Sequence, residues 1–162
     1  MLRQINWEDP AKYAYNISQN YEYMVFLYSG INLNFTGRYS LIAFDAKEIC
    51  KGDNFEILAK KLTNNHEKYH NAWFGYISYE MRHQLEELTQ NDEKFVNTAN
   101  MYFLHFDKIL IFDHHHKKAY IYCENIKYKI NFNLKPLPEL KTFQVKSLNS
   151  NMDKHTYLEK VA

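Results

Sequence analysis

The stretch Gly37-Arg38-Tyr39-Ser40-Leu41-Ile42-Ala43-Phe44 decides how this sequence is expected to fold. It is rich in residues that favour strands, and a glycine precedes it. Successive side chains of a strand point to opposite faces, so Leu41 and Ala43 share one face and Ile42 and Phe44 the other. Both faces carry apolar groups, and the pattern therefore predicts a strand that is covered on both sides.

Further strands are predicted before and after this stretch, because short apolar runs rich in β-branched and aromatic residues recur along the chain. The runs are Tyr23–Tyr28, Trp73–Tyr79, Met101–Phe112 and Lys118–Cys123, with Thr142–Val145 as a further candidate. The polar segment Asp113–Lys117 has the length of a hairpin connection. Neighbouring strands joined in this way are antiparallel.

Helices are predicted at four places. Asp9-Pro10 is a helix opening, since Asp accepts from free backbone amides and Pro fits the first turn, and the helix should run to about Asn20. Residues 54–62 repeat apolar groups at helical spacing. Met81–Leu88 has a similar pattern, and Asp153 can cap a last helix that begins at Lys154.

The composition of the chain limits the classes of function that it can have. The chain has 162 residues, which suits one domain, and a net charge of +1, so no global field attracts nucleic acid, an anionic membrane or acidic substrates. Cys50 and Cys123 lack metal-site or redox spacing, and neither a signal segment nor an apolar run of about 20 residues occurs. We therefore expect a reduced, soluble, cytoplasmic protein.

One literal motif of zinc proteases occurs, at His66-Glu67-Lys68-Tyr69-His70. On a helix the two histidines would share one face, with Glu67 beside them as a general base. The segment is polar throughout, no third ligand follows at the usual spacing, and a predicted strand begins about three residues later. Surface histidines are the interpretation that we favour.

Phe74–Tyr79 overlaps the later part of an RNA-recognition signature, in which aromatic side chains stack on bases. Ala72 and Trp73 stand where that signature begins with a basic residue and a glycine. Turn residues also follow the candidate partner strand, where that fold has a helix. An aromatic-rich RNA-binding module thus stays an alternative with little support.

No catalytic constellation has both its residues and its context. Adjacent histidines such as His114-His115-His116 converge poorly on one ion, and a solvated hairpin tip is predicted there. Glu80, Glu86 and Glu87 have no second carboxylate at a fixed distance and are expected on a helix surface. Ser29, Ser40 and Ser78 lack the strand-to-helix elbow of a hydrolase nucleophile.

Several segments, in order, resemble the N-terminal region shared by the large subunits of anthranilate synthase and aminodeoxychorismate synthase. They are Phe26–Gly30, Gly37–Ala43, Trp73–Met81 with Leu85–Leu88, Asn100–Phe103, Ile109–His114 and Ser150–Val161. The form of Phe74–Glu80 followed by Leu85–Leu88 looks closer to the para-aminobenzoate branch, aminodeoxychorismate synthase component I, than to the anthranilate branch.

This resemblance implies an α+β fold, with antiparallel sheets that form part of an orthogonal β-sandwich and with helices outside it. Residues 1–150 would be the N-terminal domain, and 151–162 the start of a C-terminal domain that binds chorismate and Mg²⁺ beyond Ala162. The parent enzyme would convert chorismate to 4-amino-4-deoxychorismate for folate biosynthesis, with ammonia from a glutamine amidotransferase subunit. This chain alone is expected to be inactive, with no catalytic or metal-binding residues.

The resemblance also implies a ligand pocket of the kind that holds tryptophan, at Ser29, Arg38, Tyr39 and Ser40. Hydroxyls can bind the ammonium and carboxylate of an amino acid, and Tyr39 can cover an indole ring. Tyr28 stands where relatives often have an acidic residue, so a carboxylate that would pair with the amine is absent there. Strands that pair with the remaining domain would expose edges, which favours self-association.

Overall fold

The structure is a computed structural model, and it describes residues 2–31, 36–63, 72–86, 98–123, 132–139 and 144–161, with only the backbone of His83. It contains eight strands, three α-helices and one 3₁₀ helix within these residues. In chain order the elements are β1 Leu2–Ile5, α1 Pro10–Ser18, β2 Met24–Leu27, β3 Tyr39–Phe44, β4 Glu48–Gly52, α2 Phe55–Thr63, β5 Ala72–Ile77, η1 (the 3₁₀ helix) Tyr79–Gln84, β6 Met101–Phe106, β7 Lys108–Asp113, β8 Lys118–Cys123 and α3 Lys154–Val161.

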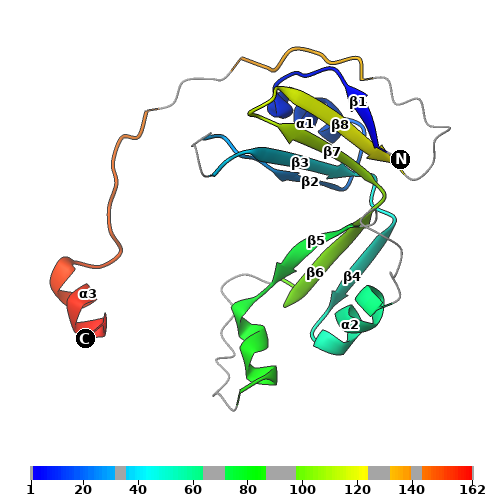
Figure 1. Cartoon of the computed structure of the whole chain (residues 1–162). Coiled ribbons are helices and arrows are strands. Elements are labelled where there is room, and N and C mark those ends of the chain that lie inside the picture. The colour runs from blue at the N-terminus through cyan, green and yellow to red at the C-terminus, as the bar shows by residue number, and fades with distance from the viewer. Residues whose placement is uncertain are drawn as a thin grey trace.

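The strands form two antiparallel sheets, which confirms the predicted α+β class (Figure 1). The larger sheet has the order β1-β8-β7-β3-β2 and the smaller one the order β4-β6-β5. Neither sheet closes on itself. β3 is paired on both sides, with β2 along one edge and β7 along the other.

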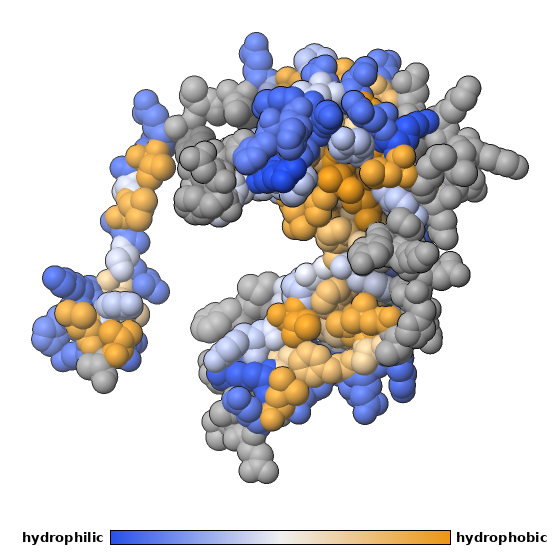
Figure 2. Space-filling model, viewed as in Figure 1, coloured by the Kyte–Doolittle hydropathy of each residue, from blue (hydrophilic) through white to orange (hydrophobic). Residues whose placement is uncertain are grey.

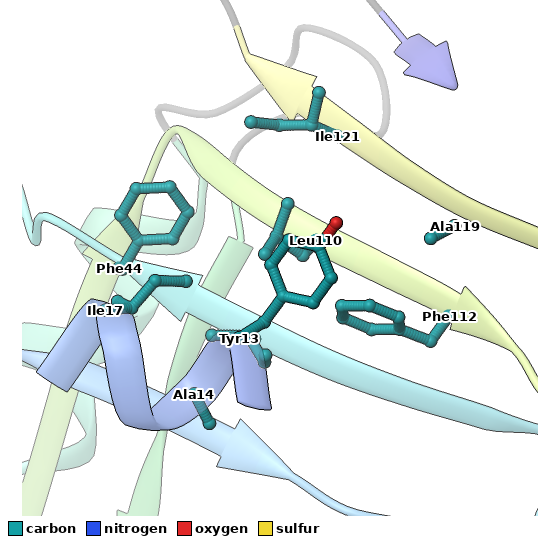
Figure 3. Packing of buried hydrophobic residues seen from close by; sticks show 9 residues of the cluster. Tyr13, Ala14, Ile17, Phe44, Leu110, Phe112, Ala119 and Ile121 are labelled. Atoms are coloured by element: carbon teal, nitrogen blue, oxygen red, sulfur yellow. The ribbon is translucent and has the colours of Figure 1, made fainter. Parts of the chain in front are cut away.

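Helix α1 covers one face of the larger sheet. Its first turn is set by Asp9, whose side chain accepts a hydrogen bond from the Ala11 amide, and by Pro10 at the start of the helix. Helical spacing then brings Tyr13, Ala14 and Ile17 to one side. Figure 3 shows these three side chains on α1 next to residues of the sheet from the same cluster, among them Phe44, Leu110, Phe112, Ala119 and Ile121.

The opposite face of the same sheet is covered in part by the smaller sheet. Ala43 of β3, Ile109 of β7 and Tyr122 of β8 pack there with Leu104 and Phe106 of β6. The prediction that β3 is buried on both faces is therefore confirmed, because Ile42 and Phe44 pack under α1 while Ala43 packs against β6.

The predicted single run Met101–Phe112 is wrong, because it divides at Asp107 into β6 and β7, which belong to different sheets. A polar cluster marks this corner. Buried Lys108 pairs with Asp45, and Lys47 lies 3.5 Å from Asp45 and 3.8 Å from Asp107. The charged pair Asp107-Lys108 interrupts the apolar residues at the corner, but strand-forming residues lie on both sides of it, so the pattern was interpreted as one run.

Helix α2 covers the outer face of the smaller sheet, where Leu58 packs with Cys50 and Met101. Its predicted extent, 54–62, agrees with the observed one within a residue. The strand β4 beside it was not predicted, because Glu48 and Lys51 hide its alternation. Strand β1 was missed for the same reason, since Arg3 and Gln4 lie at its centre.

Two other local predictions need correction. Met81–Leu88 was expected to be an α-helix, but the chain forms the 3₁₀ helix η1 instead, which ends at Gln84. The Ser78 amide donates to the Asn100 carbonyl just before it, which ties η1 closely to the start of β6. In the candidate strand Thr142–Val145, Gln144 and Val145 are not in a strand, and 142–143 lie outside the described residues.

The two sheets diverge from their contact at β6 and β7, and an open cleft lies between them (Figure 2). Apolar side chains border this cleft, and several are about half-exposed: Leu27, Ile49 and Tyr76. Helix α3 lies apart from both sheets in Figure 1, and it has no buried residue. Its start agrees with the predicted cap, since the Thr156 amide donates to Asp153.

Candidate functional site

The four residues predicted to form a ligand pocket meet at one corner of the larger sheet, where β3 begins and β7 ends. Tyr39 is opposite Asp113 in the β3–β7 register, and the His114 amide donates to the Arg38 carbonyl at 2.8 Å. Ser29 reaches the same corner from the end of β2. Strand pairing thus places Ser29, Arg38, Tyr39 and Ser40 beside the turn between β7 and β8.

The two serines are joined by hydrogen bonds within the protein. The Ser29 amide donates to Ser40 Oγ at 2.9 Å, and the Ser29 hydroxyl donates to the Tyr39 carbonyl at 2.7 Å. Ser40 Oγ also lies 2.7 Å from His114 Nε2. Because Ser40 is fully buried and held by these groups, its hydroxyl is a structural link rather than an exposed nucleophile.

Arg38 and Asp113 form the charged part of the corner. Arg38 donates from Nε and Nη2 to Asp113 Oδ2, at 3.2 and 2.8 Å, and His116 Nδ1 lies 2.9 Å from the same oxygen. The other oxygen of Asp113 accepts from the His115 and His116 amides. The hydrogen bonds from Arg38, followed by those from His116, hold the pKa of Asp113 well below its usual range.

Tyr39 presents the exposed part of the corner. Its side chain is 48% exposed, and the Arg38 guanidinium lies over its ring at 4.7 Å from the centroid. Consecutive strand residues point to opposite faces, so Tyr39 lies on the side of the cleft, whereas Ser40 lies on the side of α1. A small ligand at Tyr39 and Arg38 would therefore not reach the Ser40 hydroxyl.

His114 packs at the inner side of the corner. Its ring meets Trp7 edge to face, with 5.6 Å between centroids. Burial, together with the positive charge of Lys117, lowers the pKa of His114 despite the opposing influence of Asp9 and Asp113. The neutral form of the imidazole is therefore favoured at neutral pH.

The arrangement suits recognition rather than covalent chemistry. A half-exposed guanidinium stacked on a half-exposed aromatic ring can bind a carboxylate and cover a planar group. The serine hydroxyls serve internal hydrogen bonds, and among the described residues of this corner no base lies next to an exposed nucleophile. The described geometry therefore offers a binding surface made by Arg38 and Tyr39.

The remaining residues that the sequence analysis considered for a site lie at several different positions. His66, Glu67, His70 and Glu87 lie outside the described residues. Glu86 is exposed and Glu80 partly so, whereas Ser78 lies 3.4 Å from the side chain of Asn100. The predicted solvated histidine tip is only partly right: His115 and His116 are exposed, but His114 is bound to Ser40.

Two further features concern metals and membranes. Among the described residues, no group of three or more His, Cys, Asp or Glu side chains is placed to hold a metal ion. The resemblance implies magnesium in the C-terminal domain of the parent enzyme, and that expectation stays a prediction. Within the same ranges, every helix is too short or too polar to cross a bilayer.

A separate cavity of about 580 Å³ lies at the C-terminal end of α1, away from the predicted corner. The segment 132–135 forms its other wall. Asn16 fixes this segment, because its side chain donates to the Lys135 carbonyl at 3.0 Å and accepts from the Lys135 amide at 2.9 Å. Sequence reasoning did not anticipate this cavity, since the two segments are more than a hundred residues apart.

Sequence reasoning also missed the residues that organise the predicted corner, namely Asp113 and His114. The one available signal was the polar turn after an apolar strand, which we interpreted as a solvated tip. An Arg at the start of one strand and an Asp at the end of another become partners only in a particular register, and a single sequence does not reveal that register.

Comparison with known proteins supports the resemblance at the level of the wider family. The family model described as chorismate binding enzyme matches residues 11–162. No curated protein matches the chain. The match does not test the predicted division at residue 150, which stays a prediction. Because it covers well over half of the sequence, the chain belongs to the chorismate binding enzymes.

Proposed function

We propose that this chain is part of an aminodeoxychorismate synthase, which converts chorismate and ammonia to 4-amino-4-deoxychorismate for para-aminobenzoate and folate biosynthesis. The observation that carries the proposal is the family match over residues 11–162. The choice of the para-aminobenzoate branch rests on the sequence of Phe74–Glu80 and of Leu85–Leu88 after it, which looks closer to that branch. An anthranilate synthase component with a tryptophan feedback site is the alternative within the same family.

The described residues contribute binding and support rather than the reaction itself. The described residues contain no cluster of three or more His, Cys, Asp or Glu side chains that could hold a metal ion, and the family resemblance assigns Mg²⁺ to the C-terminal domain. A glutamine amidotransferase subunit would supply the ammonia. We expect the 162-residue chain alone to show no turnover of chorismate.

The product made by the complete gene product tells the branches apart. Purified protein is incubated with chorismate, magnesium and an ammonium salt, and the products are separated by chromatography. Formation of 4-amino-4-deoxychorismate supports the proposal, whereas anthranilate would assign the chain to the other branch. The 162-residue chain serves as the control that should give neither product.

A second proposal concerns the corner at Arg38 and Tyr39, which we infer to bind a small aromatic amino acid such as tryptophan. The half-exposed guanidinium would pair with the carboxylate of the ligand, and the Tyr39 ring would cover its aromatic group. Ser29 and Ser40 would act indirectly, because their hydrogen bonds fix the backbone of Tyr39 and the start of β3.

Titration calorimetry with tryptophan tests this second proposal. We expect heat of binding and a ligand-dependent rise in the melting temperature, because a ligand that prefers the folded state stabilises it. Tyr39→Ser should remove both. The matched control is Tyr79→Ser, since Tyr79 is also exposed and also lies beneath an arginine, Arg82, at 4.2 Å. Absence of heat with the unmodified chain would reject the proposal.

A further inference from the structure

The link between Ser29, Ser40 and His114 joins three separate elements of the larger sheet. Ser29 follows the edge strand β2, Ser40 lies in β3, and His114 begins the turn after β7. The Ser29 amide donates to Ser40 Oγ at 2.9 Å, and Ser40 Oγ lies 2.7 Å from His114 Nε2. Ser40 has no exposed surface, so water does not replace a bond that is lost there.

The hydrogen bonds of Ser40 depend on the protonation state of His114. A serine hydroxyl has one proton to donate and two lone pairs that accept. Ser40 Oγ already accepts from the Ser29 amide, and its own proton finds an acceptor at His114 Nε2 only when that nitrogen carries no proton. The complete set of bonds therefore requires neutral His114 with its proton on Nδ1.

Protonation of His114 is incompatible with that arrangement. Both ring nitrogens of an imidazolium are donors, so Nε2 would donate to the second lone pair of Ser40 Oγ. The Ser40 hydroxyl proton would then lose its acceptor inside a buried site. A buried donor without a partner is costly, so the contact between the end of β2 and β3 would open.

The groups that face His114 come from several elements. On its own turn and strand they are Asp113, His115 and Lys117; before α1 they are Trp7 and Asp9; from β3 they are Arg38 and Ser40. Lys117 opposes a second positive charge, and its ammonium lies 5.0 Å from the centre of the Trp7 ring. Asp9 and Asp113 favour the charged form, but burial outweighs them and lowers the pKa of His114.

We propose that the Ser40–His114 contact is a pH-sensitive latch, which holds the end of β2 against β3 while His114 is neutral and releases it when His114 is protonated. The latch fixes Ser29 and the backbone of Tyr39 at neutral pH. The proposal concerns the chain without any ligand, so it stands or fails independently of the proposed function.

The direction of the pH effect follows from linkage. His114 binds a proton less readily in the folded chain than in the unfolded one, whose histidine pKa is about 6.5. The latch is therefore intact above about pH 6.5, and it weakens as the pH falls through the lowered pKa of the folded state.

Amide hydrogen exchange of Ser29, measured by NMR between pH 5 and pH 8 and corrected for the intrinsic rate, tests the proposal. We expect the protection factor to be constant above neutrality and to fall by up to about tenfold per pH unit in acid, in step with the ring signals of His114. Constant protection while His114 titrates would overturn it.

Three variants sharpen the test. His114→Gln keeps an acceptor and cannot titrate, so Ser29 protection should lose its pH dependence. His115→Gln removes an exposed neighbour whose charge opposes protonation of His114, so the pH dependence should persist, with at most a small shift of its midpoint to higher pH. Ser40→Ala should remove the protection at every pH. An unchanged profile in His114→Gln, or an abolished one in His115→Gln, would contradict the latch.

Discussion

Gly75 shows at the scale of one residue how closely β5 and β6 approach each other. A β-carbon at this position would overlap the carbonyl oxygen of Tyr102 and lie 2.7 Å from the α-carbon of Phe103. Both of these atoms belong to the backbone of β6, which cannot move without loss of the strand pairing. A side chain of any size is therefore excluded from this side of the strand.

Gly75→Ala should accordingly lower the free energy of unfolding by about 1–3 kcal/mol, the usual cost of forcing an extra methyl group into a filled site. Chemical denaturation measures this change. Gly52→Ala is the matched control, because its new methyl group would meet only the flexible ends of two side chains, Ile57 at 3.1 Å and Met101 at 3.9 Å. An equal loss in the two variants would contradict the close approach.

A second residue-scale prediction concerns Asp113 and acid. Hydrogen bonds from Arg38 keep the pKa of this carboxyl low in the folded chain, whereas an unfolded Asp has a pKa of about 3.9. The unfolded chain thus takes up the proton first, and stability should fall as the pH drops below about 4. In Asp113→Asn this acid-dependent loss should be smaller, as followed by thermal melting from pH 6 to pH 2.5.

The same substitution at exposed Asp53 is the control for that experiment and should leave the acid dependence close to that of the unmodified chain. If Asp113→Asn and the unmodified chain lose stability in parallel, the Arg38–Asp113 pair does not contribute in the way that we describe.

At the scale of the element, the start of α1 depends on its cap. Asp9→Ala removes the acceptor of the Ala11 amide, 2.8 Å away, and should cost about 1 kcal/mol of stability. Asn caps helices about as well as Asp, so Asp9→Asn should cost little. Thermal or chemical unfolding of both variants measures the difference. Similar losses in the two would show that charge, rather than capping, is the contribution of Asp9.

A helix or strand of this fold could be predicted where its own residues show a recognisable pattern. The helix α1 and the strand β3 were predicted because a cap and an apolar alternation are local features. The strands β1 and β4 pair with β8 and β6, and charged or polar residues interrupt the apolar pattern of their own sequences. The division at Asp107 was missed because the corner is set by distant partners, above all Asp45.

The candidate site shows the same division. Ser29, Arg38, Tyr39 and Ser40 were named through the family resemblance, and the structure brings them to one corner. Their hydrogen-bonding partners Asp113 and His114 are some 75 residues away, and no local pattern pairs them with β3. Alternation along β3 also places the side chains of Tyr39 and Ser40 on opposite faces of the sheet. The resemblance named both residues for one pocket and did not show this separation.

At the scale of the whole molecule, the open cleft between the sheets leaves apolar surface in contact with water (Figure 2). Leu27 lies on the edge strand β2 with 50% of its side chain exposed. An exposed edge with apolar side chains favours pairing with another chain. The earlier expectation of self-association thus stays a prediction, now with a defined surface.

Sedimentation velocity at increasing protein concentration should show association of the unmodified chain, and Leu27→Glu should reduce it because a charge is placed on the edge. Leu85→Glu is the control, since Leu85 is 75% exposed but lies after η1, away from β2. A monomer at every concentration, or an equal effect of both variants, would argue against this surface.

We propose that this chain serves an enzyme that aminates chorismate on the para-aminobenzoate branch. The most direct measurement is chromatographic analysis of chorismate incubated with the complete gene product, magnesium and ammonia. We predict that chorismate is consumed and that 4-amino-4-deoxychorismate appears. Anthranilate as the product would contradict the branch, and intact chorismate in the presence of folded enzyme would contradict the claim as a whole.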